Sequence, residues 1–188
     1  MTTKTSELLA AAEPRTIAVV QGISDDQLDL PTPCCDYSVR DLLNHLFDVV
    51  VNFQALARQQ EVDWSAKTDH LTEGWRERFA AETVRLVEAW SDPAALEGVS
   101  SGMGLPQETL GDMALIDLTV HGWDLARATG QRVEVEPTVL AAGHGFMDRM
   151  GDTGQRMGAF GEPVPTASEA TELDRLLGRT GRNPAWTP

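Results

Sequence analysis

Residues 115–130, LIDLTVHGWDLARATG, read as a buried helix that nevertheless carries three ionisable side chains. Apolar residues dominate the run, and Gly130 stands where a helix commonly ends. Asp117, His121 and Asp124 interrupt it. Burying a polar group without a partner costs about 2–7 kcal/mol even when the group is neutral. Each of the three therefore needs a partner, which can be a neighbouring side chain, water or a metal ion.

Apolar residues recur at helical spacing in four long segments, which predicts helices over 4–22, 38–59, 70–91 and 106–129. Pro14 falls inside the first and predicts a kink or a break there. Ser38 and Asp41 form a capping-box pattern at the start of the second. Pro106 fits the first position of the fourth helix, which is the most apolar, and Gly130 fits its C-cap.

The remainder of the chain is less regular. Pro137 opens a helix to about Met150, a Gly/Pro-rich loop follows, and Ser168 starts a short helix, SEATELDRLLG. No alternating pattern long enough for a strand is present in the sequence. We therefore expect an all-α four-helix bundle with a short helical C-terminal extension. The expected organisation is one domain over 1–188, with the bundle at about 4–130 and the helical tail at 131–188.

Two histidines lie on apolar surfaces of different predicted helices. His45 is seven residues after Ser38, about 10 Å along its helix, and His121 is nine residues before Gly130, about 13–14 Å from that end. The rings share a depth if these two helices are antiparallel, whereas parallel helices leave a mismatch of about 12 Å. An up-down-down-up bundle makes them antiparallel, with the polar segment 59–70 as the long crossover.

Asp117 and His121 are four residues apart and share one face of their helix. A carboxylate and an imidazole one turn apart form a two-ligand platform of the kind that helical bundles use for metal ions. His45 supplies a third ligand from the other helix. Without a metal, Asp117 and His121 pair with each other and His45 is an ordinary core histidine. The three together, at matching depth on the two most apolar helices, favour the metal site.

Other polar residues have less specific readings. Asp124 is expected to accept a hydrogen bond behind a ligand or to pair with Arg127. Cys34 precedes a helix N-terminus, where a thiolate is stabilised, although a small buried residue fits equally well. His70 and His144 are expected at the surface.

Composition limits the partners and the compartment. The 188 residues are 41% hydrophobic and carry a formal net charge of −14, which disfavours binding to nucleic acid or to an anionic membrane surface. Cys34 and Cys35 are adjacent and are not expected to form a disulfide, which fits the reducing cytoplasm. The first twenty residues do not resemble a signal peptide, and no apolar run is long enough to span a bilayer.

Three stretches carry a resemblance to a known family: LPTPCCDYSVRDLLNHL (30–46), DLTVHGWDLARATGQ (117–131) and FGEPVPTASEATELDRLLGRTGRNPAW (160–186). They resemble an actinobacterial metal-binding family of the DinB/YfiT-like superfamily, similar to the N-terminal domain of mycothiol-dependent maleylpyruvate isomerase. The resemblance implies an up-down-down-up bundle and a divalent metal on His45, Asp117 and His121. Some relatives have Glu or His in place of Asp117, whose reach is shorter than that of Glu. The isomerase has a further C-terminal domain, so its activity is not carried over.

Two histidines and a carboxylate leave metal positions open, as in catalytic sites. Zinc is the first choice of metal, with nickel and iron also compatible. The expected function is a divalent-metal-binding, thiol-dependent enzyme, a thiol S-transferase or isomerase acting on a small electrophile, with mycothiol or bacillithiol as the thiol that the resemblance implies. The alternative is a non-catalytic metal-binding or sensing bundle whose helices dimerise. The expected partners are therefore a small-molecule thiol, an electrophilic substrate and a second copy in a homodimer.

Overall fold

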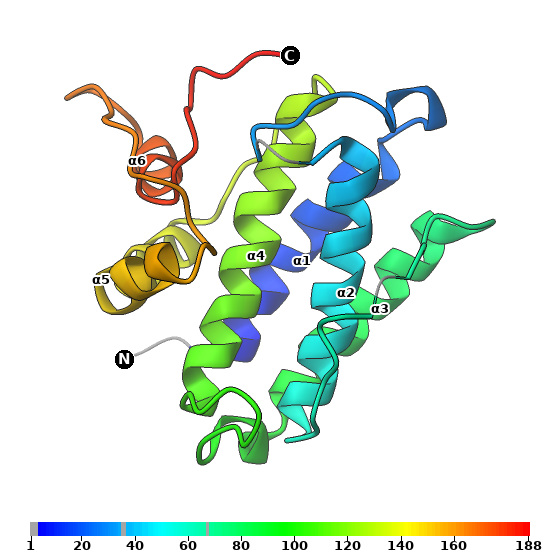
Figure 1. Cartoon of the computed structure of the whole chain (residues 1–188), viewed down its shortest axis with the longest axis vertical. Coiled ribbons are helices and arrows are strands. Elements are labelled where there is room, and N and C mark those ends of the chain that lie inside the picture. Colours follow the sequence, from blue (N-terminus) through cyan, green and yellow to red (C-terminus); the bar gives the residue numbers. More distant parts are fainter. Residues whose placement is uncertain (1–3, 35–36, 67) are drawn as a thin grey trace.

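The computed structural model describes residues 4–34, 37–66 and 68–188, and these form six α-helices without a β-strand (Figure 1). The helices are α1 Thr5–Gln21, α2 Val39–Ala57, α3 Trp75–Ser91, α4 Gln107–Ala128, α5 Pro137–Arg156 and α6 Glu172–Arg179. Two short 3₁₀ turns, Asp25–Gln27 and Pro93–Leu96, lie in the connections. The predicted all-α class is confirmed.

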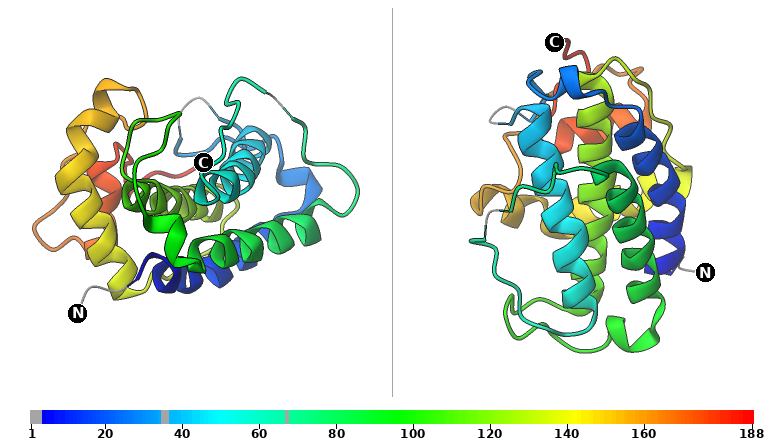
Figure 2. Two further views of the ribbon diagram at one scale, coloured as in Figure 1. Left: turned by 90° about the horizontal axis from the view of Figure 1, so that it is seen from below. Right: turned by 90° about the vertical axis from the view of Figure 1, so that its right-hand side faces the viewer.

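The first four helices form the predicted up-down-down-up bundle. In Figure 1, α1 and α4 run upward while α2 and α3 run downward. Figure 2 shows the connection from α2 to α3, described over 58–66 and 68–74, carrying the chain back along the bundle. Both α1 and α2 pack against α3 and α4. Helices α2 and α4 are therefore antiparallel neighbours, as the depth of the two histidines required.

Local signals for the bundle helices are mostly confirmed. The Ser38 hydroxyl accepts from the Asp41 N–H at 3.3 Å, and the Asp41 carboxylate accepts from the Ser38 N–H at 3.1 Å. Gly130 takes φ +72° just after α4, and the following N–H of Gln131 donates to the Ala126 carbonyl oxygen at 2.8 Å. Pro14 lies inside α1 without ending it, because it sits on the exposed side, where water can satisfy the carbonyl that it leaves unpaired.

Three predicted helix boundaries were wrong: the starts of α3 and α6, and the end of α5. Helix α3 begins at Trp75 rather than 70, since Gly74 takes φ +71° and the backbone N–H of His70 is bound by the Asn44 side chain instead. Helix α6 begins at Glu172 rather than at Ser168, because Thr171 and Asp174 form a reciprocal capping box.

Helix α5 continues to Arg156, past the predicted end at Met150. Its last glycines are tolerated because neighbouring side chains, one from the same helix and one from the segment after it, use the space they leave. A Cβ at Gly154 would overlap the Phe160 ring, and one at Gly151 would lie 3.3 Å from the Met147 side chain. Packing therefore outweighs the low helix propensity of glycine here.

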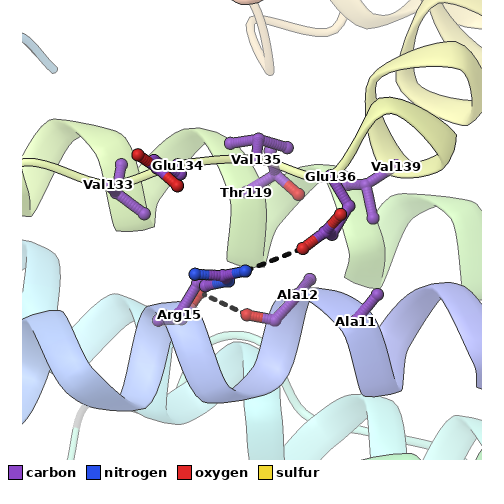
Figure 3. A pocket seen from close by; sticks show the side chains of 10 residues that line it. Ala11, Ala12, Arg15, Thr119, Val133, Glu134, Val135, Glu136 and Val139 are labelled. Atoms are coloured by element: carbon purple, nitrogen blue, oxygen red, sulfur yellow. Dashed lines mark hydrogen bonds and ion pairs between the residues drawn. The ribbon is translucent and has the colours of Figure 1, made fainter.

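The extension packs on the outer side of α4. Helix α5 contacts α4 and α1, and α6 contacts α5. A second apolar cluster joins them, formed by Ile116, Val120, Trp123, Phe146, Met147, Leu176 and Leu177. The connection 131–136 is tied to α1 by an ion pair between Arg15 and Glu136 at 2.7 Å (Figure 3). The hollow beneath this pair, about 10 Å³, holds at most one water molecule.

Among the helices that the described residues form, none combines the length and the hydropathy needed to cross a bilayer.

Candidate metal centre

The antiparallel packing of α2 and α4 brings His45, Asp117 and His121 together. One potential ligand atom from each of the three lies within 4.8 Å of the others. The His45 and His121 rings are 5.0 Å apart between centroids and nearly perpendicular, at 89°. The structure thus joins the three residues that the sequence singled out, although His45 precedes Asp117 by 72 residues in the sequence.

His121 is fixed by a hydrogen bond to a carboxylate. Its Nδ1 lies 3.0 Å from Oδ2 of Asp124, a side chain with no exposed surface. A carboxylate accepts, so Nδ1 carries a proton, and in the neutral ring Nε2 is the nitrogen that has the lone pair. The Nε2 atom lies 3.9 Å from Oδ1 of Asp117, beyond hydrogen-bond distance. This geometry is that of a ligand imidazole with a carboxylate behind it.

Burial sets the charge states of the other two residues. Desolvation, helped by the nearby charges of His121 and Arg182, lowers the pKa of His45 to about 4, although Asp48 opposes the shift. At neutral pH the ring is therefore neutral, which is the form that binds a metal. Burial also raises the pKa of Asp117, and the charges of His121 and Arg182 oppose that shift. A carboxylate in this position is stabilised in its ionised form by an added cation.

Asp124 pairs with Arg182 rather than with Arg127. Arg182 Nη2 lies 3.1 Å from Asp124 Oδ2, its Nε lies 3.4 Å from Oδ1, and both side chains are buried. Arg127 instead donates to the backbone carbonyl oxygens of Trp186 at 2.7 Å and Pro184 at 3.4 Å. The expectation of an Asp124–Arg127 pair was wrong, while the expected acceptor role behind a ligand agrees with the geometry.

Sequence reasoning missed Arg182. It is the one arginine among the described residues that is buried, and it lies 58 residues after its partner Asp124. Helical periodicity reports only neighbours within a few turns, so it carries no signal for this pair. The available signal was its place in the stretch GRTGRNPAW, which contributed to the family resemblance.

Cys34 lies beside the same group. Arg182 Nη2 is 3.5 Å from its Sγ, and the sulfur also lies within 4.8 Å of potential ligand atoms of His121 and Asp124. The prediction that Cys34 and Cys35 do not bridge concerns Cys35, which lies outside the described residues.

The two remaining histidines are engaged elsewhere and are less exposed than predicted. His70 Nε2 lies 2.7 Å from Asp48 Oδ1, and its ring stacks on Phe47. His144 Nε2 lies 3.1 Å from the Glu172 carbonyl oxygen. Their side chains are 19% and 22% exposed, so a purely surface placement was wrong for both.

The three candidate ligands face a cleft of about 660 Å³. Its polar part is lined by Cys34, Tyr37, His45, Asp117, His121 and Arg182, and most of the rest is apolar. The volume suits a small organic molecule. The cluster is therefore a group of side chains that could hold a metal ion, with room beside it for a small organic molecule.

Comparison with known proteins places this site in a family. Two curated relatives, uncharacterized proteins from two strains of Mycobacterium tuberculosis, are each 29% identical over 177 residues, covering 88% of this chain and 92% of theirs. No solved structure matches the chain significantly. The sequence profile of the mycothiol maleylpyruvate isomerase N-terminal domain matches residues 9–126, which include His45, Asp117, His121 and Asp124 but not Arg182. The chain, with its helical bundle and this match over most of its length, belongs to the mycothiol maleylpyruvate isomerase N-terminal domain family.

Proposed function

We propose that this protein is a divalent-metal-binding, thiol-dependent enzyme that transfers a thiol to a small electrophile or isomerises it. The observation that carries the proposal is the convergence of His45, Asp117 and His121 on the wall of the cleft. Two imidazoles and one carboxylate leave coordination positions open, as catalytic sites require. A binding module without turnover, the alternative class, has no need of a 660 Å³ cleft beside its ligands.

The donor set fits a divalent ion, with zinc first and nickel or iron also compatible. His45 is neutral at neutral pH, and the hydrogen bond from Nδ1 of His121 leaves Nε2 as the ring nitrogen available to a metal. The 3.9 Å between His121 Nε2 and Asp117 Oδ1 is within the span of two atoms bound to one ion by bonds of about 2.0–2.2 Å. Bound there, the ion would stabilise the thiolate form of a thiol ligand.

The protein's own residues prepare the site for this chemistry. Asp124 holds the His121 ring and fixes its tautomer, and Arg182 holds Asp124. The thiol loses its proton, its sulfur forms a carbon–sulfur bond with an activated double bond, and the adjacent carbon takes up a proton. Retention of this adduct is thiol transfer. Rotation about the new single bond, followed by loss of the same proton and departure of the sulfur as thiolate, gives the isomer, and the thiolate and proton together regenerate the thiol. The family description supports mycothiol as the thiol.

The cellular setting is also part of the proposal. We place the protein in the cytoplasm, because its two cysteines are adjacent in sequence and offer no disulfide framework. The net charge of −14 supports small-molecule partners rather than nucleic acid. A homodimer stays a prediction, which sedimentation of the purified protein tests.

Turnover with a defined thiol tests the proposal. Zinc-loaded protein is incubated with mycothiol and a panel of unsaturated small electrophiles that includes maleylpyruvate, and adducts and isomers are followed by mass spectrometry. Product formation that needs both mycothiol and His45 is expected. His144→Ala, which removes a histidine outside the cluster, serves as the matched control. Equal turnover by His45→Ala, or no thiol-dependent product across the panel, would contradict the proposal.

A further inference from the structure

The cleft is polar at one end and apolar at the other. Along α2 it is lined by His45, Val49 and Phe53, each one turn further down the helix. Along α4 it is lined in reverse order by His121, Asp117 and Met113. Because α2 and α4 are antiparallel, the two rows change from polar to apolar in the same direction, over about 12 Å for eight residues at 1.5 Å each. The space between them therefore suits an elongated ligand.

The apolar end is enclosed by segments from outside these two helices. Trp64, whose ring contacts that of Phe53, comes from the α2–α3 connection, and Met103 comes from the loop before α4. Met150, Met157 and Phe160, from the end of α5 and the segment after it, also line the cleft. Methionine side chains adapt to irregular apolar shapes. A hydroxyl-rich body of the electrophile would lose its water at this end without gaining partners, which costs free energy. This end consequently selects an apolar body.

The polar end carries a guanidinium suited to an anion. Arg182 lines the cleft, and its Nη2 and Nε contact Asp124. Among the residues that the structure describes, its Nη1 donates to the Thr180 carbonyl oxygen alone, so one N–H remains for a ligand. Asp117 and Asp124 contribute two negative charges, Arg182 one positive charge and a divalent ion two. Before a thiolate binds, the metal-loaded end is thus singly positive and complements a monoanion.

We propose that the cleft binds a monocarboxylic acid with an elongated apolar body, its carboxylate beside the metal ligands and Arg182 and its body along Val49, Phe53 and Met113. The inference rests on the proposed function for the position of the head group. There the acid would be the electrophile, so the substrate class is an unsaturated carboxylic acid with an apolar chain or aryl group. Arg182 lies outside the matched family segment, so this selectivity belongs to the extension of the chain.

Titration calorimetry with saturated probe acids tests this class. Acetate, hexanoate, octanoate and decanoate are titrated into zinc-loaded and metal-free protein, with 1-octanol as the uncharged comparison. Affinity is expected to rise about fourfold per methylene, equivalent to about 0.8 kcal/mol, until the apolar end is filled. Octanoate is expected to bind at least tenfold more tightly than 1-octanol to the zinc-loaded protein.

Substitutions at Met113 and Arg182 test which end of the cleft holds the apolar body of the ligand and which holds its carboxylate. Met113→Gln keeps the side-chain size but adds polar atoms, so it should weaken octanoate at least fourfold and leave acetate unchanged. Arg182→Gln should remove the preference of octanoate over octanol, and Arg182→Lys should restore part of it. Arg182→Gln leaves the buried Asp124 carboxylate without the charge of Arg182 and can unfold the chain. The chain-length series and Met113→Gln do not depend on that variant.

The outcomes separate this inference from the proposed function. One outcome is that zinc binds to the three ligands while acetate and octanoate bind with equal affinity. That result would contradict the apolar body of the ligand and leave the metal site unaffected. If the affinity rises with the chain length of the acid in a protein that binds no zinc, the ligand class is supported and the proposed metal chemistry is overturned. Equal binding of octanoate and 1-octanol to the zinc-loaded protein would overturn the anionic head group.

Discussion

His121 shows how one side chain acquires its role from neighbours at three distances along the chain. Asp117, one turn before it, lies 3.9 Å from Nε2, and Asp124, one turn after it, binds Nδ1 at 3.0 Å. His45 reaches it from another helix, with ring centroids 5.0 Å apart. The first two neighbours could be predicted from helical spacing. The third needed the depth argument, which depends only on the positions of helix ends and on the rise per residue.

The low pKa of His45 predicts an acid-sensitive stability in the metal-free protein. Its folded pKa of about 4 lies below the unfolded value of 6.5, so the unfolded chain takes up this proton first. The contribution of the neutral His45 to the free energy of unfolding is complete above about pH 6.5 and is lost as the pH falls towards 4. The loss is up to about 3 kcal/mol, at about 1.4 kcal/mol per pKa unit. Burial raises the pKa of Asp117, which acts in the opposite direction over its own range.

Denaturant unfolding of wild type and His45→Gln between pH 7.5 and 4, with a chelator present, measures this effect. The wild type should lose more free energy of unfolding than the variant across this interval. Parallel curves for the two proteins would show that His45 is not held neutral by its surroundings.

At the scale of elements, the sequence predicted the helices of the bundle better than their contacts. Four helices, the Ser38 capping box and the Gly130 terminus were read from local patterns that the structure repeats. The start of α3 was missed because it depends on Asn44, a side chain distant in sequence. The extent of α5 was missed because it depends on the packing of Gly154 against Phe160, which lies beyond the end of the helix. Local propensity contains no information about such partners.

Alanine substitution of two helix glycines tests the contacts between helices. Gly111 is buried in α4, where a Cβ would lie 2.5 Å from the Thr5 methyl carbon and 3.2 Å from the Trp90 ring, both on neighbouring helices. Gly145 in α5 has only the tip of Arg149 nearby, at 3.4 Å. Gly111→Ala should therefore destabilise the fold by about 1–3 kcal/mol through overpacking, while Gly145→Ala should stabilise it by about 0.5–1 kcal/mol through helix propensity.

Chemical denaturation of the two alanine variants beside the wild type gives both values. A Gly111→Ala protein as stable as the wild type would mean that α1, α3 and α4 do not pack as closely as described.

For the whole molecule, the extension is part of the site as well as of the fold. Arg127 and Asp124, both on α4, hold the backbone at 184–186 and the side chain of Arg182. Helix α5 and the segment after it supply Met150, Met157 and Phe160 to the cleft. The sequence indicated a helical tail but not its position, because apolar periodicity shows that a helix has a buried face without showing what covers it.

The central claim, that His45, Asp117 and His121 hold a divalent ion, is tested most directly by the metal content of the protein. Untagged wild type, His45→Ala, His121→Ala and the control His144→Ala are purified, supplied with zinc, dialysed and examined by elemental analysis. The account predicts close to one ion per chain in the wild type and the control, and loss of that ion in both cluster variants. A wild type without metal, or cluster variants that keep it, would contradict the account.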